Sequence, residues 1–233
     1  MTSFSILRDI RFLGSKTRLW TSSHSLDQIM IFLHGSGITS FGMEKWLRSA
    51  APQGPPPKIG VILPSAPMRK YLLDGGELRS VWHQRRDIDI NSYFEDIQGI
   101  DEMCLGLKDL VTDVKNAGVS HITLGGFSMG GHLALHSVYR EELHVSKCFA
   151  LSSFVIHKSA LYKKNNYTNT NSKVPLYLAH GDSDSIVPHI WAQSCAEKMK
   201  NKNVETTLRI YRDIGHEIRS DIISDLFTWT KRK

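Results

Sequence analysis

Continuous apolar runs alternate with helical periodicities along most of this chain. Residues 59–63 read Ile-Gly-Val-Ile-Leu, with no polar position among them. Unbroken runs of this length are typical of strands that are covered on both faces of a mainly parallel sheet. Residues 204–211 instead alternate between apolar and polar positions, as a half-exposed strand does. The strands predicted on these grounds are residues 29–33, 59–63, 121–127, 147–151, 174–179 and 204–211.

Helical periodicity fills the spaces between these runs. In residues 93–116 apolar side chains recur every three or four positions, which is the period of a helix with one buried face. Gly118 then fits the C-cap of that helix. Further helices are predicted at residues 129–139, 189–200 and 217–230. Alternating strands and helices predict an α/β fold, with a mainly parallel central sheet and helices on both faces.

The remaining segments are predicted to be connections. Residues 1–25 are expected to form an irregular or hairpin start, and residues 51–57 are a proline-rich link. Residues 81–82 are expected to form a short strand before a charged loop. Residues 165–173 are rich in Asn and Thr, which indicates a surface loop. With 233 residues and no internal repeat, the chain suits a single domain that spans residues 1–233.

The predicted strand 121–127 runs into a turn with the pattern Gly-x-Ser-x-Gly, at Gly126, Ser128 and Gly130. In a nucleophile elbow, such a turn joins a strand to a helix and exposes the serine hydroxyl at the end of a sheet. The pattern alone is weak, because it arises by chance in about one chain in ten of this length. A glycine-rich turn with an unreactive serine is therefore the alternative, whereas the pattern of a phosphate-binding P-loop is absent from the sequence.

An acid and a base follow Ser128 at the ends of later predicted strands. Working side chains of open α/β sheets lie beyond the carboxyl ends of the strands. The chain order Ser, Asp, His is that of the α/β-hydrolases. His216 lies between the last strand and the last helix, where it fits the base that takes the proton of the serine. Asp184 fits the acid that orients this base, although Asp182 competes for the role and is otherwise expected to stabilise a turn.

Two other histidines also lie at the ends of predicted strands. His34 and His180 each precede a glycine, and we expect both to brace loops by hydrogen bonding. A zinc site built from His34, His180 and His216 is conceivable, but no spacing typical of zinc ligands supports it. The chemistry read from the sequence therefore requires no metal and no cofactor.

Serine hydrolases also need two hydrogen-bond donors that are aimed at the developing oxyanion. The backbone N–H of Met129 directly follows the predicted nucleophile and supplies one of them. The loop at residues 34–37 is expected to supply the other, from the backbone N–H of Ser36.

Charge and cysteine content narrow the class of protein further. The formal charge is +6, but the basic residues are scattered, so no basic patch indicates binding to nucleic acid. At most a transient contact with anionic membrane surfaces is expected.

The three cysteines are far apart and odd in number, which indicates free thiols in a reducing compartment. Charged residues near the N-terminus argue against a signal peptide. The predicted location is therefore cytoplasmic, and the predicted state a monomer or weak dimer.

Several motifs together resemble the acyl-protein thioesterases, also called lysophospholipases, and most of all their lysophospholipase-like branch. They are Phe-Leu-His-Gly-Ser-Gly at 32–37, Leu-Pro-Ser-Ala-Pro at 63–67, residues 125–131, Ala-Leu-Ser-Ser-Phe at 150–154, and residues 180–188. The resemblance implies an α/β-hydrolase fold with Ser128, Asp184 and His216 as catalytic triad. It also implies an oxyanion hole from the Ser36 and Met129 amides. S-acylated proteins, lysophospholipids and small esters are the implied substrates.

The same resemblance places Ile38, Trp82 and Phe154 beside the bound substrate. The chain departs from the family after the His-Gly loop and after Trp82. The resemblance therefore does not predict a preference for acyl chain length. The expected function is a serine hydrolase that cleaves acyl thioesters and esters through an acyl-enzyme on Ser128. The alternatives are a short-chain carboxylesterase without a role in protein depalmitoylation, a peptidase or lactone hydrolase, and a non-catalytic binding protein on a hydrolase scaffold.

Overall fold

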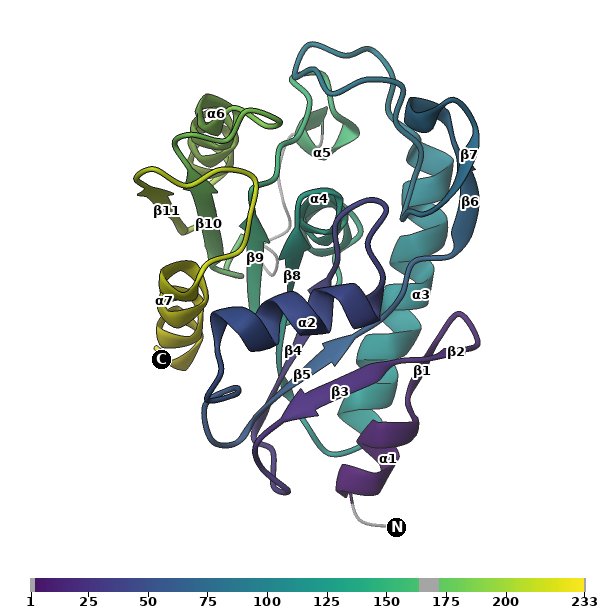
Figure 1. Cartoon of the computed structure of the whole chain (residues 1–233), viewed down its shortest axis with the longest axis vertical. Coiled ribbons are helices and arrows are strands. Elements are labelled where there is room, and N and C mark those ends of the chain that lie inside the picture. The colour runs from purple at the N-terminus through teal and green to yellow at the C-terminus, as the bar shows by residue number, and fades with distance from the viewer. Residues whose placement is uncertain (1–2, 164–171, 233) are drawn as a thin grey trace.

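The computed structural model describes residues 3–163 and 172–232, and these residues build one central sheet. Seven strands lie in the order β11-β10-β9-β8-β4-β5-β3, and all neighbours are parallel except β3 and β5 (Figure 1). The mainly parallel sheet predicted from the apolar runs is thus confirmed. The strands are β1 Arg11–Phe12, β2 Ser15–Lys16, β3 Arg18–Thr21, β4 Gln28–Leu33, β5 Ile59–Leu63, β6 Met68–Tyr71, β7 Glu77–Ser80, β8 His121–Phe127, β9 Lys147–Leu151, β10 Leu176–Gly181 and β11 Thr206–Tyr211.

Helices cover both faces of this sheet, as the sequence predicts (Figure 1). Helices α3, α4 and α6 pack against one face, and α2 and α7 pack against the other. The helices are α1 Ser3–Asp9, α2 Ser40–Ala50, α3 Ile97–Asn116, α4 Met129–Leu135, α5 Ala160–Lys163, α6 His189–Lys200 and α7 Ser220–Lys231, with short helical turns η1 at Leu72–Asp74 and η2 at His136–Arg140.

Strand β4 shows why an unbroken apolar run is needed at the centre of the sheet. Successive side chains of a strand point to opposite faces. Accordingly, Ile29, Ile31 and Leu33 pack with the helices of one layer, whereas Met30 and Phe32 pack with those of the other. All five are essentially inaccessible to water. Both faces therefore bury apolar area, which is the main source of stability for such a sheet.

Several element boundaries match the prediction closely. Strands β5 and β9 and helix α6 have the predicted bounds. Gly118 follows α3 with φ +91° and donates its N–H to Lys115 O at 2.9 Å, which confirms its capping role. The predicted helix 93–116 begins later, at Ile97, because the Asp96 carboxylate caps it by accepting from the Gly99 N–H at 3.0 Å. The polar loop predicted at 165–173 falls largely outside the described residues.

Other regions differ from the prediction. The start of the chain does contain a hairpin of β1 and β2, but it also contains α1 and the strand β3, which joins the main sheet. Helix α2 has no counterpart in the prediction, because polar Ser40 and Glu44 share its buried face with Met43 and Leu47. The strand expected at residues 81–82 is wrong: pairing with β6 ends at Ser80.

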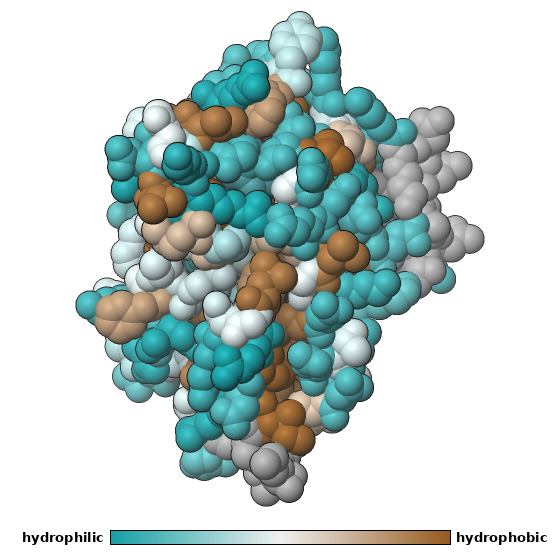
Figure 2. Space-filling view, turned by 90° about the vertical axis from the view of Figure 1, so that its right-hand side faces the viewer, coloured by the Kyte–Doolittle hydropathy of each residue, from teal (hydrophilic) through white to brown (hydrophobic). Residues whose placement is uncertain are grey.

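The hairpin of β6 and β7 stands apart from the main sheet, beside α3 (Figure 1). Figure 2 views the molecule from that side and shows a mostly hydrophilic surface interrupted by a narrow run of hydrophobic side chains. Within residues 3–163 and 172–232, none of the helices combines the length and apolarity that crossing a bilayer requires. The three cysteines Cys104, Cys148 and Cys195 are buried and free, as predicted.

The packing of α3 predicts a contrast between two leucines on the same helix. Leu107 is fully buried in the core, whereas Leu105 is 66% exposed. We expect Leu107→Ala to lower the free energy of unfolding by about 2–5 kcal/mol, because it leaves a cavity in a packed interior. Leu105→Ala should change it by less than about 0.5 kcal/mol. Urea unfolding measures both, and equal losses would contradict the described orientation of α3.

Candidate active site

Ser128 occupies a strained turn between β8 and α4. Its backbone has φ +53° and ψ −116°, a conformation that costs free energy for a residue with a side chain. Neighbouring groups hold it there: the Ser128 N–H donates to Leu151 O at 2.8 Å, and the Ser153 hydroxyl donates to Ser128 O at 2.7 Å. This is the geometry of a nucleophile elbow, which exposes the serine hydroxyl at the carboxyl edge of the sheet.

The glycines of the motif allow the elbow to lie against β4. A Cβ atom placed on Gly126 or on Gly130 would lie 2.4 Å or 2.3 Å from the carbonyl oxygen of Leu33. Neither contact is relieved by a side-chain rotation, because the oxygen belongs to the backbone of a central strand. The Gly-x-Ser-x-Gly pattern is therefore a packing requirement at this position.

Asp184 lies in the turn after β10, and its side chain is inaccessible to water. Its Oδ1 atom accepts the backbone N–H groups of Ile186 at 3.0 Å and Val187 at 2.8 Å. Burial disfavours the charge, but hydrogen bonds from His180, His216 and the Val187 N–H outweigh it. The pKa of Asp184 is therefore lowered well below its ordinary value, so the carboxylate stays ionised at neutral pH.

His216 contacts this carboxylate directly. Its Nδ1 atom lies 2.7 Å from Asp184 Oδ2, and its ring packs on the ring of Phe127 with 4.8 Å between centroids. The two loops that carry Asp184 and His216 meet because Gly181 approaches the chain closely: a Cβ on Gly181 would lie 2.1 Å from Ile214 O. Of the two candidate acids, Asp184 contacts His216, whereas among the described residues no hydrogen bond joins Asp182 to it.

Asp182 instead stabilises the neighbouring turn, as expected. Its Oδ1 atom accepts from the Ser183 hydroxyl at 2.9 Å and from the Asp213 N–H at 2.8 Å. His180 braces the same region: its Nε2 atom lies 2.7 Å from Val187 O and 3.2 Å from Asp184 Oδ2. Its role in bracing a loop matches the prediction.

His34 holds the first loop of the site in place. The Ala66 N–H donates to His34 Nε2 at 2.9 Å, so the proton of the neutral ring lies on Nδ1 and is donated to Gly35 O at 2.8 Å. Burial lowers the pKa of His34 to about 4. A Cβ built on Gly35 would lie 3.5 Å from the Cβ of Ser128, which shows how closely this loop passes the elbow.

A cavity of about 380 Å³ opens between these loops, and Ser128 and His216 both line it. Among the described residues, no hydrogen bond joins the Ser128 hydroxyl to His216; catalytic hydrogen bonds often tighten only when substrate binds. Ser36 and Met129 also line the cavity, and the described part of the chain offers no acceptor to either backbone N–H. The other lining residues are Gly35, Ile38, Trp46, Tyr71, Leu73, Arg85, Ile88, Phe127, Phe154, Ile186 and Val187.

Two of the three predicted substrate-binding residues, Ile38 and Phe154, thus line the cavity. The expectation for Trp82 is wrong. Its side chain is fully buried, and its Nε1–H donates to His34 O at 2.8 Å. Trp82 therefore supports the His34 loop, packing against the His34 ring with 4.7 Å between centroids, and does not line the cavity.

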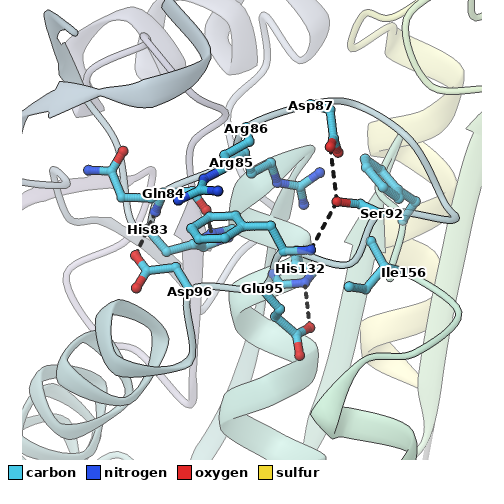
Figure 3. Close-up of a pocket in the computed structure, with 12 residues that line it drawn as sticks. His83, Gln84, Arg85, Arg86, Asp87, Ser92, Glu95, Asp96, His132 and Ile156 are labelled. Atoms are coloured by element: carbon cyan, nitrogen blue, oxygen red, sulfur yellow. Dashed lines mark hydrogen bonds and ion pairs between the residues drawn. The ribbon is translucent and has the colours of Figure 1, made fainter.

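A cluster of buried histidines under the elbow was not anticipated. His132 and His136 follow Ser128 on α4 and η2, and both approach the Glu95 carboxylate, with their Nε2 atoms 3.7 Å and 3.2 Å from Oε1. His83 stacks on His132 with 4.7 Å between centroids. Figure 3 shows His132 pointing at Glu95. The four-residue spacing of His132 and His136 is a sequence signal for a shared helix face, but nothing local identifies Glu95 as their partner.

Glu95, His132 and His136 are close enough to hold a metal ion, but their hydrogen bonds favour a different role. Arg140 Nε donates to His136 Nδ1 at 2.9 Å, so the proton of His136 lies on Nε2, the atom that would have to bind the metal. Glu95 also accepts from the Ser159 hydroxyl at 2.6 Å and the Ala160 N–H at 2.8 Å. We therefore assign this cluster a structural role rather than metal binding. His34, His180 and His216 do not form a metal-binding group either.

The buried histidines predict that acid destabilises the fold. Burial lowers the pKa of His132 to about 3 and of His34 to about 4, and it also lowers the pKa values of His83 and His136. Below about pH 6.5 the unfolded chain takes up protons that the folded chain does not, so the free energy of unfolding falls as the pH drops. From pH 6.5 to 4 the loss should reach on the order of 3 kcal/mol for His34 alone. Urea unfolding at several pH values measures it.

Two variants separate this effect from general acid sensitivity. His132→Gln removes one buried titrating site. It should reduce the slope of the free energy of unfolding against pH, in the acidic range, by roughly 1 kcal/mol per pH unit. His121→Gln changes an exposed histidine and should leave the slope as it is. An unchanged slope in His132→Gln would contradict the neutral, buried state of this ring.

The comparisons with known proteins agree with this geometry. The chain matches the phospholipase/carboxylesterase family over residues 17–232. It is 33% identical to mouse lysophospholipase-like protein 1 over 213 residues, covering 90% of this chain and 87% of that protein. It is 28% identical to acyl-protein thioesterase 1 of Emericella nidulans over 208 residues, covering 84% and 86% of the two chains.

The fold is also that of a solved relative. The crystal structure of Zea mays acyl-protein thioesterase 2 matches with a TM-score of 0.81 at 22% identity, covering 92% of this chain and 96% of that one. This confirms the predicted α/β-hydrolase fold. With this fold, the Gly-x-Ser-x-Gly elbow and the family match over nearly the whole chain, the protein belongs to the phospholipase/carboxylesterase family of hydrolases.

Proposed function

We propose that this protein hydrolyses acyl esters and thioesters through an acyl-enzyme formed on Ser128. The observation that carries the proposal is the 2.7 Å hydrogen bond between Asp184 and His216 at the wall of a cavity that Ser128 also lines. Three residues far apart in the sequence come together there in the roles that an alcohol nucleophile needs.

The hydrogen bonds around His216 suit a general base. Because Asp184 is ionised, His216 Nδ1 carries the proton of this bond, and the lone pair of the neutral ring lies on Nε2. In the proposed mechanism, Nε2 takes the proton of the Ser128 hydroxyl as the oxygen attacks the acyl carbonyl. The imidazolium, stabilised by Asp184, then gives this proton to the departing oxygen or sulfur, so that an alcohol or a thiol leaves. In the second half of the reaction, His216 takes a proton from water, which attacks the acyl-enzyme. The proton then returns to Ser128 as the carboxylic acid is released.

The developing oxyanion needs donors that are already in place. The Met129 N–H belongs to the first turn of α4, where backbone amides have no partner within the helix. The Ser36 N–H comes from the loop that His34 and Trp82 hold against the elbow. Both residues line the cavity, which supports their assignment to the oxyanion hole. The loss of one such donor typically costs about 3 kcal/mol of transition-state stabilisation.

The walls of the cavity support an acyl substrate. Ile38, Trp46, Phe127 and Ile186 present apolar side chains near Ser128, as a site for a hydrocarbon chain requires. We therefore propose S-acylated proteins or small acyl esters and thioesters as substrates. A short-chain carboxylesterase is the second candidate, since short acyl groups also fit a cavity of about 380 Å³. We further propose that the protein acts in the cytoplasm as a monomer or weak dimer.

Removal of the Ser128 hydroxyl tests the nucleophile. We expect Ser128→Ala to abolish labelling by a fluorophosphonate probe and to lower kcat for p-nitrophenyl butyrate by at least roughly 10³-fold. Ser224→Ala, on the exposed face of α7, should leave both unchanged. Labelling of Ser128→Ala at the rate of the original protein would reject this assignment. If the original protein hydrolyses no acyl ester or thioester, the non-catalytic alternative is favoured.

Substitution of the acid tests the hydrogen bond itself. In Asp184→Asn the side chain keeps its shape but loses the charge that orients His216 and stabilises its protonated form. We expect kcat to fall by roughly 10³–10⁴-fold. Asp182→Asn keeps the acceptor oxygen for the Asp213 N–H and should lose less than tenfold. Similar losses in the two variants would contradict the choice of Asp184.

A further inference from the structure

Arg85 is a cation in the wall of an otherwise largely apolar cavity. It lines the cavity together with Ser128 and His216. Its side chain is half-buried, and its Cζ atom lies 4.3 Å above the centre of the Phe154 ring. This stacking orients the guanidinium. Its N–H donors, which lie in the plane of the guanidinium, stay available, because an aromatic face does not accept five hydrogen bonds.

Nearby carboxylates do not neutralise Arg85. In the described part of the chain, none lies within ion-pair distance of its guanidinium. Burial lowers the pKa of Arg85 to about 10, and the neighbouring carboxylates of Glu95 and Asp87 oppose this shift only in part. Both carboxylates accept hydrogen bonds elsewhere, Glu95 from Ser159 and Ala160 and Asp87 from Ser92. A partly buried cation without a counter-ion is costly unless a ligand completes it.

Tyr71 supplies a second unsatisfied group in the same cavity. Its side chain is 3% exposed, and its buried hydroxyl has no hydrogen-bond partner. Ser36 lies near enough to influence the pKa of this hydroxyl, although no hydrogen bond of normal geometry joins them. Because Ser36 belongs to the proposed oxyanion hole, the free hydroxyl lies close to the reacting end of the cavity.

Gln84 fixes these two groups relative to one another. Its side chain donates to Lys70 O at 2.9 Å and accepts from the Leu72 N–H at 3.0 Å, so it is bonded to both neighbours of Tyr71. Its own N–H donates to the Asp96 carboxylate at 2.8 Å. Arg85 directly follows Gln84. The cation and the hydroxyl are therefore held on a preformed support, which lowers the entropic cost of binding a ligand.

We propose that Arg85 and Tyr71 bind an oxyanionic group of the substrate, a carboxylate or a phosphate, within a few bonds of the scissile carbonyl. This inference rests on the proposed function and adds a substrate class to it: acyl esters or thioesters that carry a negative charge close to the bond that is cleaved. A guanidinium and a hydroxyl are the donors that carboxylates and phosphates bind. The charge resides either on a dicarboxylic acyl group or on a phosphorylated leaving group.

Two substrate pairs distinguish these sources. For the acyl group, the 4-methylumbelliferyl ester of adipic acid is compared with the same ester whose free carboxyl is methylated. For the leaving group, hexanoyl glycerol 3-phosphate is compared with hexanoylglycerol. We expect the charged member of at least one pair to have the higher kcat/KM, and the pair that responds identifies the source of the charge.

Variants show whether Arg85 causes this preference. In Arg85→Gln the ratio of kcat/KM for charged over neutral substrate should fall roughly tenfold or more, since charge-assisted hydrogen bonds are the strong ones. Tyr71→Phe should lower the same ratio less. Arg86→Gln is the matched control: it makes the same charge change one residue away, at an exposed side chain that stacks on Phe94 and does not line the cavity. Figure 3 shows both arginines on the same loop.

A binding measurement keeps this inference separate from the proposed function. N-butyl adipamic acid is an amide that resists hydrolysis, and calorimetry compares its binding with that of the neutral diamide in which the free carboxyl is converted to a methylamide. Tighter binding of the acid, lost in Arg85→Gln and kept in Arg86→Gln, supports the inference even if no ester is hydrolysed. Equal binding of the acid and the neutral diamide, or equal losses in the two arginine variants, would overturn it, whatever the result of fluorophosphonate labelling.

Discussion

The hydrogen bond between Asp184 and His216 is the interaction on which the proposed chemistry depends. It joins the loop after β10 to the loop after β11, two neighbouring parallel strands whose carboxyl ends lie at one edge of the sheet. The loops meet because Gly181 has no side chain to hold them apart. Backbone N–H groups fix the other carboxylate oxygen, so the acid is oriented before any substrate arrives.

Ser128, the proposed nucleophile, is held by a different set of contacts, and polar groups are buried to provide them. Above the elbow, His34 and Trp82 fix the loop that passes over Ser128. Below it, Glu95 ties the helix that begins at the elbow to the segment at Ser159 and Ala160. Buried histidines and carboxylates are costly, but a hydrogen-bonded network also restricts the backbone to one arrangement. Such rigidity suits a site in which the oxyanion donors must be in place in advance.

Regular elements of this fold are predictable because they repeat a simple pattern. The apolar run at 59–63 predicted the bounds of β5, and the order Ser, Asp, His predicted three residues that the structure brings to one edge of the sheet. Helix α2 was missed because Glu44 is buried through its bonds with Arg18 and Arg48, which no periodicity records. Trp82 was misplaced because a resemblance shows that a residue is near a site but not which side of a loop its ring occupies.

Long-range pairs are the part that sequence reasoning could not reach. Tyr71 and Arg85 are brought to one cavity by the side chain of Gln84, and Glu95 meets His136 across 41 positions of the chain. These contacts depend on how loops fold back over the sheet, which local propensity does not determine.

Acid quenching of the protein during turnover of p-nitrophenyl butyrate, followed by mass spectrometry of its peptides, tests the central claim most directly. The account predicts a butyryl group on the peptide that contains Ser128. The fraction of this peptide that is butyrylated should rise when deacylation is slowed. Turnover with this peptide unmodified and a butyryl group on another residue would contradict it.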